Sequence, residues 1–124
     1  MTYLIVFLGA GIGGAMRHGV NLGAARWLGV AFPSGTLIVN VVGGLAMGIV
    51  AAWFMAHGGA SQHWRLFLTT GILGGFTTFS AFSLDAVALY ERGAIGLAVL
   101  YVAASVVGAI AALAIGLAIG RAIS

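Results

Sequence analysis

The residue types that could do chemistry gather in one short segment of an otherwise apolar chain. Phenylalanine recurs there every three residues, and a hydroxyl residue follows each one: Phe76, Phe79 and Phe82, then Thr77, Ser80 and Ser83. The edge of an aromatic ring is partially positive, and hydroxyls donate hydrogen bonds. Together these groups could replace part of an anion's hydration shell. The alternative is an aromatic packing stripe whose hydroxyls bond internally.

Glycines just before this segment predict an interruption of its helix. Gly71, Gly74 and Gly75 precede Thr77 and Thr78. Glycine is a poor helix former, and threonine offers the backbone competing hydrogen bonds. A break near residues 74–78 would free carbonyl oxygens, which are good ligands for a hard, weakly charged cation. The alternative is a continuous helix whose hydroxyls bond back to its own carbonyls.

A few other polar side chains interrupt apolar stretches of the sequence. Asn40 must have a partner or a role, because an unpaired amide in an apolar environment is costly. Tyr101 and Ser105 are four residues apart and would share one helix face. Asp85 is expected to pair with an arginine or to face water, with a proton relay as the alternative.

No catalytic arrangement emerges from the remaining residues. The three histidines, His18, His57 and His63, are scattered, there is no cysteine, and no two carboxylates are paired. Residues 9–14 match GxGxxG, but that fingerprint needs a strand–helix–strand unit and an acid about 20 residues later. The first acid here is Asp85. We interpret the chain as a conduit rather than an enzyme.

The composition identifies the surroundings in which these residues act. The chain has 124 residues, of which 62% are hydrophobic and 6% are charged, whereas a soluble domain carries roughly 25% charged residues. So few charges cannot cover a soluble globule. Five arginines are also too few for a nucleic-acid footprint. The composition therefore predicts an integral membrane protein and no nucleic-acid partner.

The apolar stretches predict an all-α fold with four transmembrane helices in a single membrane domain, residues 1–124. A span needs about 20 apolar residues, and four stretches qualify: residues 3–27, 35–56, 66–90 and 94–120. A signal peptide at residues 1–16 is the alternative for the first stretch, but it lacks a basic leading region. The third stretch is centred on residue 78, which places its polar segment in mid-membrane.

The arginines give almost no preference for one orientation in the membrane. Arg65 and Arg121 would lie on one face, and Arg26, Arg92 and Arg17 on the other. The positive-inside rule needs an excess on one side. We therefore expect dual topology, in which an upright and an inverted copy pair about a two-fold axis in the membrane plane.

Small residues predict close packing of the helices. Glycines spaced four apart let helix backbones approach each other in lipid, and the chain contains 21 glycines. Five such pairs occur: Gly9/Gly13, Gly19/Gly23, Gly44/Gly48, Gly71/Gly75 and Gly116/Gly120.

The segment Gly74-Gly-Phe-Thr-Thr-Phe-Ser-Ala-Phe-Ser83 resembles the signature of the fluoride-channel family known as CrcB or Fluc. Residues 35–43, Gly-Thr-Leu-Ile-Val-Asn-Val-Val-Gly, resemble the family's second-helix motif. Residues 13–17, Gly-Gly-Ala-Met-Arg, resemble its first-helix motif. The resemblance extends along most of the chain and includes its length and its four spans.

The resemblance implies passive export of fluoride through the inner membrane of a prokaryotic cell. It implies an antiparallel homodimer with two pores and a third helix broken in mid-membrane. It also implies a structural sodium ion on the two-fold axis, bound by the backbone carbonyls of Gly74 and Thr77 from both subunits. Hydrofluoric acid would leak into the cell, ionise there, and leave through the channel as fluoride.

The resemblance also assigns roles to individual side chains. Phe79 and Phe82 would line the pores with their ring edges, and Asn40 would donate hydrogen bonds there. Arg17 would attract anions at a vestibule. The polar track would be continued by Ser80, Ser83, Tyr101 and Ser105. Two residues depart from the family pattern, which commonly has threonine at Ala81 and glutamate at Asp85.

Two other interpretations compete with the channel. A small multidrug exporter is also a dual-topology dimer with four helices, but it depends on a glutamate in its first helix, and residues 3–28 contain no acid. In a non-conducting membrane scaffold, the row of phenylalanines and hydroxyls would only pack.

Overall fold

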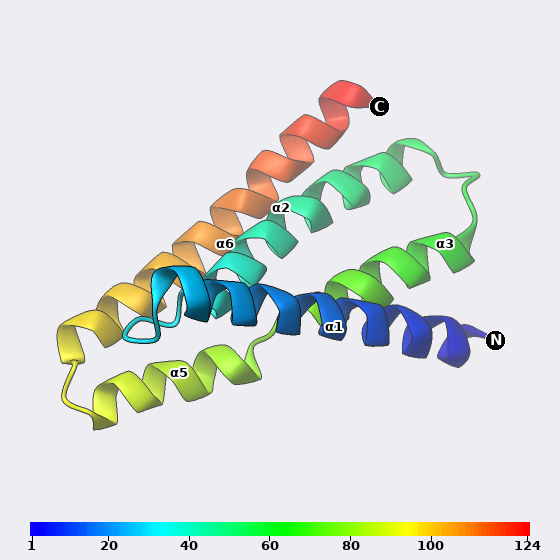
Figure 1. Ribbon diagram of the computed structural model, residues 1–124. Coiled ribbons are helices and arrows are strands. Elements are labelled where there is room, and N and C mark those ends of the chain that lie inside the picture. Colours follow the sequence, from blue (N-terminus) through cyan, green and yellow to red (C-terminus); the bar gives the residue numbers. More distant parts are fainter.

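The computed structural model describes residues 1–124, and its regular elements are all helical (Figure 1). Four helical stretches are long and apolar enough to cross a membrane: Thr2–Leu28, Ser34–Ala56, Gln62–Glu91 and Ile95–Ile123. This confirms the all-α prediction with four apolar membrane-spanning helices. The third stretch begins at Gln62, four residues before the predicted start at Leu66. Its first turn is polar, so the apolar pattern of the sequence did not include it.

Three of the stretches are single helices, whereas the third consists of several segments. The single helices are α1 (Thr2–Leu28), α2 (Ser34–Ala56) and α6 (Ile95–Ile123). The third stretch has a first arm, Gln62–Phe76, and a second arm, α5 (Ser80–Glu91). The first arm runs without a gap through α3 (Gln62–Leu66), the π-helical η1 (Phe67–Leu73) and α4 (Gly74–Phe76).

Glycines set the closest approaches between the helices. α2 and α6 lie side by side along much of their lengths (Figure 1). A Cβ atom on Gly48 would clash with the carbonyl oxygen of Leu113, and one on Gly116 would clash with that of Leu45. On the other side, α1 packs against the first arm, where a Cβ atom on Gly9 would come within 2.9 Å of the Cα atom of Gly71. Of the five glycine pairs, only Gly19/Gly23 meets open space at both positions.

Short connections join the helices at their ends. Gly29 and Gly93 have φ angles of 84° and 85°, which L-residues with a side chain rarely adopt, so the turns there require glycine. The side chain of Arg92 donates a hydrogen bond to the carbonyl of Ala31 and ties two of these connections together. Only 19 of the 124 residues are buried. A single chain thus leaves most of its apolar surface for lipid or another protein to cover.

Candidate functional site

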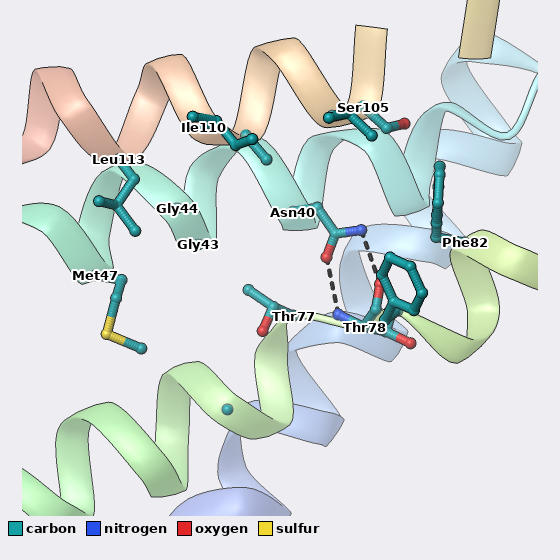
Figure 2. A pocket seen from close by; sticks show the side chains of 14 residues that line it. Asn40, Gly43, Gly44, Met47, Thr77, Thr78, Phe82, Ser105, Ile110 and Leu113 are labelled. Atoms are coloured by element: carbon teal, nitrogen blue, oxygen red, sulfur yellow. Dashed lines mark hydrogen bonds between the residues drawn. The ribbon is translucent and has the colours of Figure 1, made fainter. Parts of the chain in front are cut away.

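The site is built around residues Thr77–Phe79, which separate the two arms of the third stretch. Thr77 has φ −83° and ψ 159°, an extended conformation. Its amide still donates to the carbonyl of Leu73 at 3.0 Å, as in a helix. The next amide, that of Thr78, turns away from the first arm and donates to the side chain of Asn40 at 2.8 Å (Figure 2).

Asn40 pairs with both polar groups of the Thr78 backbone. Its Oδ1 accepts from the Thr78 amide, and its Nδ2 donates to the Thr78 carbonyl, each at 2.8 Å (Figure 2). An extended peptide away from water needs such partners, and a half-buried amide side chain needs them as well. The partner expected for Asn40 is therefore the interrupted backbone. The second N–H of its Nδ2 remains for another acceptor. That Asn40 donates a hydrogen bond in the pore therefore stays a prediction.

The side chain of Thr78 binds an amide in the first turn of the second arm. Its Oγ1 accepts a hydrogen bond from the amide of Ala81 at 3.1 Å, which is the role of a residue that caps a helix N-terminus. Its Oγ1 also lies 3.3 Å from the hydroxyl oxygen of Ser80. A side chain thus replaces a helical carbonyl as the acceptor for the first turn of α5.

Because the amides of Thr78 and Ala81 donate to side chains, two carbonyl oxygens lose their helical hydrogen bonds. In a continuous helix the Thr78 amide would donate to Gly74, and the Ala81 amide to Thr77. Both amides donate to side chains instead, and no hydrogen bond in the structure ends on either carbonyl oxygen. The released oxygens are those of Gly74 and Thr77, the two residues whose carbonyls were predicted to bind a cation.

A pocket of about 590 Å³ adjoins the interruption. Among the predicted site residues, those lining it are Asn40, Gly74, Thr77, Phe79, Phe82 and Ser105, with apolar side chains of α2 and α6 completing the wall (Figure 2). Ser105 is only 5% exposed, and its Oγ has no hydrogen-bond partner. The pocket therefore combines released main-chain oxygens, aromatic rings and an unpaired hydroxyl.

The three phenylalanines of the row have different surroundings. Phe76 is buried in the first arm. Phe79 is 76% exposed, although its ring centroid lies only 5.3 Å from that of the buried Phe82. The Phe82 ring lies 5.4 Å from that of Tyr101, against which Phe32 packs edge-on at 5.5 Å. Sequence reasoning missed Phe32, whose only signal is its place beside the single proline.

Two hydroxyl residues of the row, Ser80 and Ser83, do not line the pocket, whereas Thr77 does. Ser83 donates to the carbonyl of Phe79 at 2.9 Å, one turn back in its own chain. Ser80 is exposed and lies near Thr78. Tyr101 is fully buried behind Phe82. The structure thus brings Ser105 into the pocket but leaves Ser80, Ser83 and Tyr101 outside it, and their place in a polar track remains a prediction.

Asp85 does not line the pocket, and two hydroxyl groups hold its carboxylate. Its Oδ2 accepts hydrogen bonds from the hydroxyls of Thr36 at 2.8 Å and Tyr101 at 3.1 Å. The expectation that Asp85 pairs with an arginine is therefore wrong, because hydroxyl groups from α2 and α6 bind its carboxylate instead. The alternatives that it faces water or relays protons stay predictions. Thr36 was also missed in the sequence, although it precedes Asn40 by four residues and so shares its helix face.

Arg17 is the remaining predicted residue. It is half-buried near the middle of α1, and its Nε donates to the carbonyl of Gly75 at 3.2 Å. It does not line the pocket. The contact with Gly75 does not test whether Arg17 attracts anions, so that role stays a prediction.

Four apolar helices around a polar interruption define a multi-pass helical membrane protein. The chain matches, over residues 4–117, the model of a family described as CrcB-like protein, Camphor Resistance (CrcB), and it belongs to that family.

Several curated relatives resemble the chain along nearly its whole length. A protein of Rhodopseudomonas palustris (strain BisB5) is 62% identical over 124 residues, which cover 100% of both chains. A protein of Methylobacterium nodulans is 62% identical over 121 residues, 98% of this chain and 97% of the relative. Both relatives are named fluoride-specific ion channel FluC. A third, from Nitrobacter hamburgensis, is 54% identical over 121 residues, 98% of each chain, and is named fluoride-specific ion channel FluC 2.

Proposed function

We propose that the chain is a fluoride-selective channel that conducts passively and releases fluoride from the cytoplasm. The observation that carries the proposal is the pocket in which Phe79, Phe82 and the unpaired hydroxyl of Ser105 meet beside the interruption. The names of the relatives support fluoride as the ion. Membership of the family supports conduction over the alternative of a non-conducting scaffold.

The chemistry of the pocket suits a small anion that holds its water tightly. Such an ion enters a narrow path only if protein donors replace its hydration shell. Ser105 has a free hydroxyl, and Asn40 has an N–H not used on Thr78. The rings of Phe79 and Phe82 can add their positive edges. None of these groups carries a full charge, so an ion can leave as well as enter.

We infer that the channel is an antiparallel homodimer with two pores. The pocket lies on the surface of the single chain, and Phe79 is 76% exposed beside carbonyl oxygens that lack donors. Lipid tails cannot satisfy such carbonyls, so this face must be covered by protein or line a water-filled cavity, and an interface between two copies that encloses pores provides both. Arg26 and Arg92 lie near one end of the helices, and Arg65 and Arg121 near the other. This balance suits copies inserted in both orientations.

A structural sodium ion fits the residues present. The carbonyl oxygens of Gly74 and Thr77 are among those released from helical bonding, and carbonyl oxygens are suitable ligands for a hard cation. We propose that both carbonyls from each subunit hold the ion at the centre of the dimer. Bound there, sodium would neutralise the released oxygens and join the two interruptions in mid-membrane.

Passive export fits the absence of an acidic residue from α1. The membrane-embedded glutamate that drives a small multidrug exporter has no counterpart there. Fluoride that enters a prokaryotic cell as hydrofluoric acid ionises in the less acidic cytoplasm. A passive pore in the inner membrane then suffices to release it.

The deciding experiment is anion efflux from liposomes containing the purified protein. We expect rapid release of fluoride and hardly any release of chloride, followed with ion-selective electrodes. Protein-free liposomes provide the baseline. Vesicles that retain fluoride would exclude the channel. Equal release of both ions would exclude its selectivity.

The sodium ion is tested separately during assembly. Purification and reconstitution with a bulky organic cation in place of sodium should give an impaired channel, and restoring sodium should recover the flux. Full activity in the absence of sodium would contradict a structural ion.

A further inference from the structure

Arg17 is one of two charged residues that lie in the interior of the membrane-spanning stretches. The other is Asp85, whereas the remaining five lie within a few residues of a stretch end. A charge far from the helix ends is expensive in lipid and needs a partner. Arg17 does not contact either acid; the partner of its Nε is a main-chain carbonyl.

That carbonyl belongs to Gly75, and the interruption has also deprived it of its helical donor. In a continuous helix the amide of Phe79 would donate to it, but no such bond exists in the structure. The Nε of Arg17 donates to this oxygen at 3.2 Å. A cation at this place also meets the negative end of the first arm, where unpaired carbonyls concentrate.

The approach of α1 makes this contact possible. A Cβ atom on Gly75 would clash with the carbonyl oxygen of Ala10, and one on Gly13 would lie 2.8 Å from the amide nitrogen of Phe76. The backbone of α1 therefore lies directly against the last turn of the first arm. Arg17 is one turn further along the same helix, from where its side chain reaches back to Gly75.

The interruption leaves the carbonyls of Gly74, Gly75, Phe76 and Thr77 without helical donors, and these carbonyls fall into two groups according to whether a side chain replaces the donor. Those of Gly74, Phe76 and Thr77 receive no donor, whereas that of Gly75 receives the Arg17 side chain. Gly74 and Gly75 are consecutive in one helical turn, so fixing the peptide of Gly75 restricts the direction of the Gly74 carbonyl. Gly74 lines the pocket, but Arg17 does not.

We propose that Arg17 is a positioning residue. Its hydrogen bond holds the end of the first arm against α1 and so keeps the third stretch interrupted rather than continuously helical. This role differs from attraction of anions by charge, because it depends on the N–H at the ε position. A lysine keeps the positive charge but has a methylene group at that position. The proposal relies on the proposed function only where flux is measured.

The test compares Arg17→Lys and Arg17→Met with Arg26→Lys and Arg26→Met. Arg26 lies on the same helix but is exposed and packs over the ring of Trp27, so it provides a matched control. Hydrogen exchange by mass spectrometry follows the amides of residues 74–82 in the detergent-solubilised protein. Liposome efflux follows fluoride release by the same variants.

We expect both Arg17 variants to accelerate exchange at residues 74–82 about tenfold or more, the effect of losing one charge-assisted hydrogen bond. Amides in the middle of α2 and α6 should exchange as in the wild type, and the Arg26 variants should change neither region. Fluoride release should fall to a similar extent in Arg17→Lys and Arg17→Met.

Wild-type exchange and flux in Arg17→Lys would overturn the proposal and leave a role for charge alone. Equal acceleration across all helices would also overturn it, because that result marks general destabilisation. If the wild-type protein releases no fluoride, the proposed function fails, but the exchange measurement still decides whether Arg17 holds the interruption.

Discussion

The contact between α2 and α6 differs from the contacts of the third stretch in how its helices are held. Glycines hold α2 to α6 by bringing one backbone against the other. In contrast, side-chain hydrogen bonds hold the third stretch to the other stretches, through Arg17, Thr36, Asn40 and Tyr101. Packing alone suffices for continuous helices in lipid, whereas an interrupted backbone needs polar partners from all its neighbours.

The largest effect should come from enlarging a glycine in the α2–α6 contact. Gly48→Leu would place a side chain on the backbone of α6 near Leu113, and backbone cannot rotate away as a side chain can. Extra methylene groups in a well-packed interior typically cost about 1–3 kcal/mol. A leucine side chain adds four carbons against backbone that cannot move aside, so we expect a cost at or above the upper end of that range and little folded protein. Size-exclusion chromatography and thermal unfolding in detergent measure the loss.

Gly96→Leu is the matched control, because a Cβ atom on Gly96, also in α6, meets open space. It should give normal yield and a normal elution volume. If Gly48→Leu also behaved normally, close backbone approach would not be what holds α2 to α6.

The difference between the two regions also explains how far the sequence could predict them. Four helices follow from apolar length alone, because a membrane span requires it. The glycines and threonines before Phe79 indicated where an interruption could lie, with a continuous helix as the alternative. That Asn40 needs a partner was predictable, but Thr78 as its partner was not, because the pair lies 38 residues apart and depends on how α2 packs.

Asp85 illustrates the same limit. Its charge suggested an arginine, whereas the structure pairs it with two hydroxyls that come from α2 and α6. Which of several polar side chains meet at one depth depends on helix rotation and register. Neither quantity can be deduced from a sequence in which nearly every helix face is apolar.

The second largest effect should come from Asn40→Leu, which keeps the side-chain volume but leaves both polar groups of Thr78 without partners. Each unsatisfied group costs about 1–3 kcal/mol. We therefore expect a clear drop in thermal stability and at least about a hundredfold loss of fluoride flux, as two such groups imply. Thermal unfolding and liposome efflux measure the two effects.

The matched control is Thr69→Val. The hydroxyl of Thr69 bonds only to the carbonyl of Arg65 in its own helix, so its loss should leave both measurements nearly unchanged. Wild-type flux in Asn40→Leu would show that the interruption does not need its amide partner.

A smaller and more selective effect is expected from Phe79→Ile and Phe82→Ile. Isoleucine keeps the apolar character of the side chain but removes the ring edge. We expect flux to fall about fivefold or more in each variant, since aromatic interactions contribute on the order of 1 kcal/mol. The dimer should survive in both, as judged by chromatography.

The two positions should differ in stability. Phe82 is 8% exposed and packs against Tyr101, whereas Phe79 is 76% exposed in the single chain. Only Phe82→Ile should therefore lower the stability of the subunit itself. Phe7→Ile, on the outer surface of α1, is the control. Unchanged flux in both pocket variants would mean that the rings only pack.

The smallest effect should come from Ser105→Ala, and it separates conduction from stability most cleanly. The Oγ of Ser105 is buried without a partner, so its removal breaks no hydrogen bond. Stability should stay within about 0.5 kcal/mol of the wild type or rise slightly, while flux should fall about threefold if the hydroxyl donates to the passing ion.

Ser83→Ala is the control, and it should lower stability but leave flux unchanged, because that hydroxyl is already bonded to Phe79 and lies outside the pocket. If Ser105→Ala conducts normally and Ser83→Ala does not, the ion passes along the second arm and does not use the hydroxyl group in the pocket.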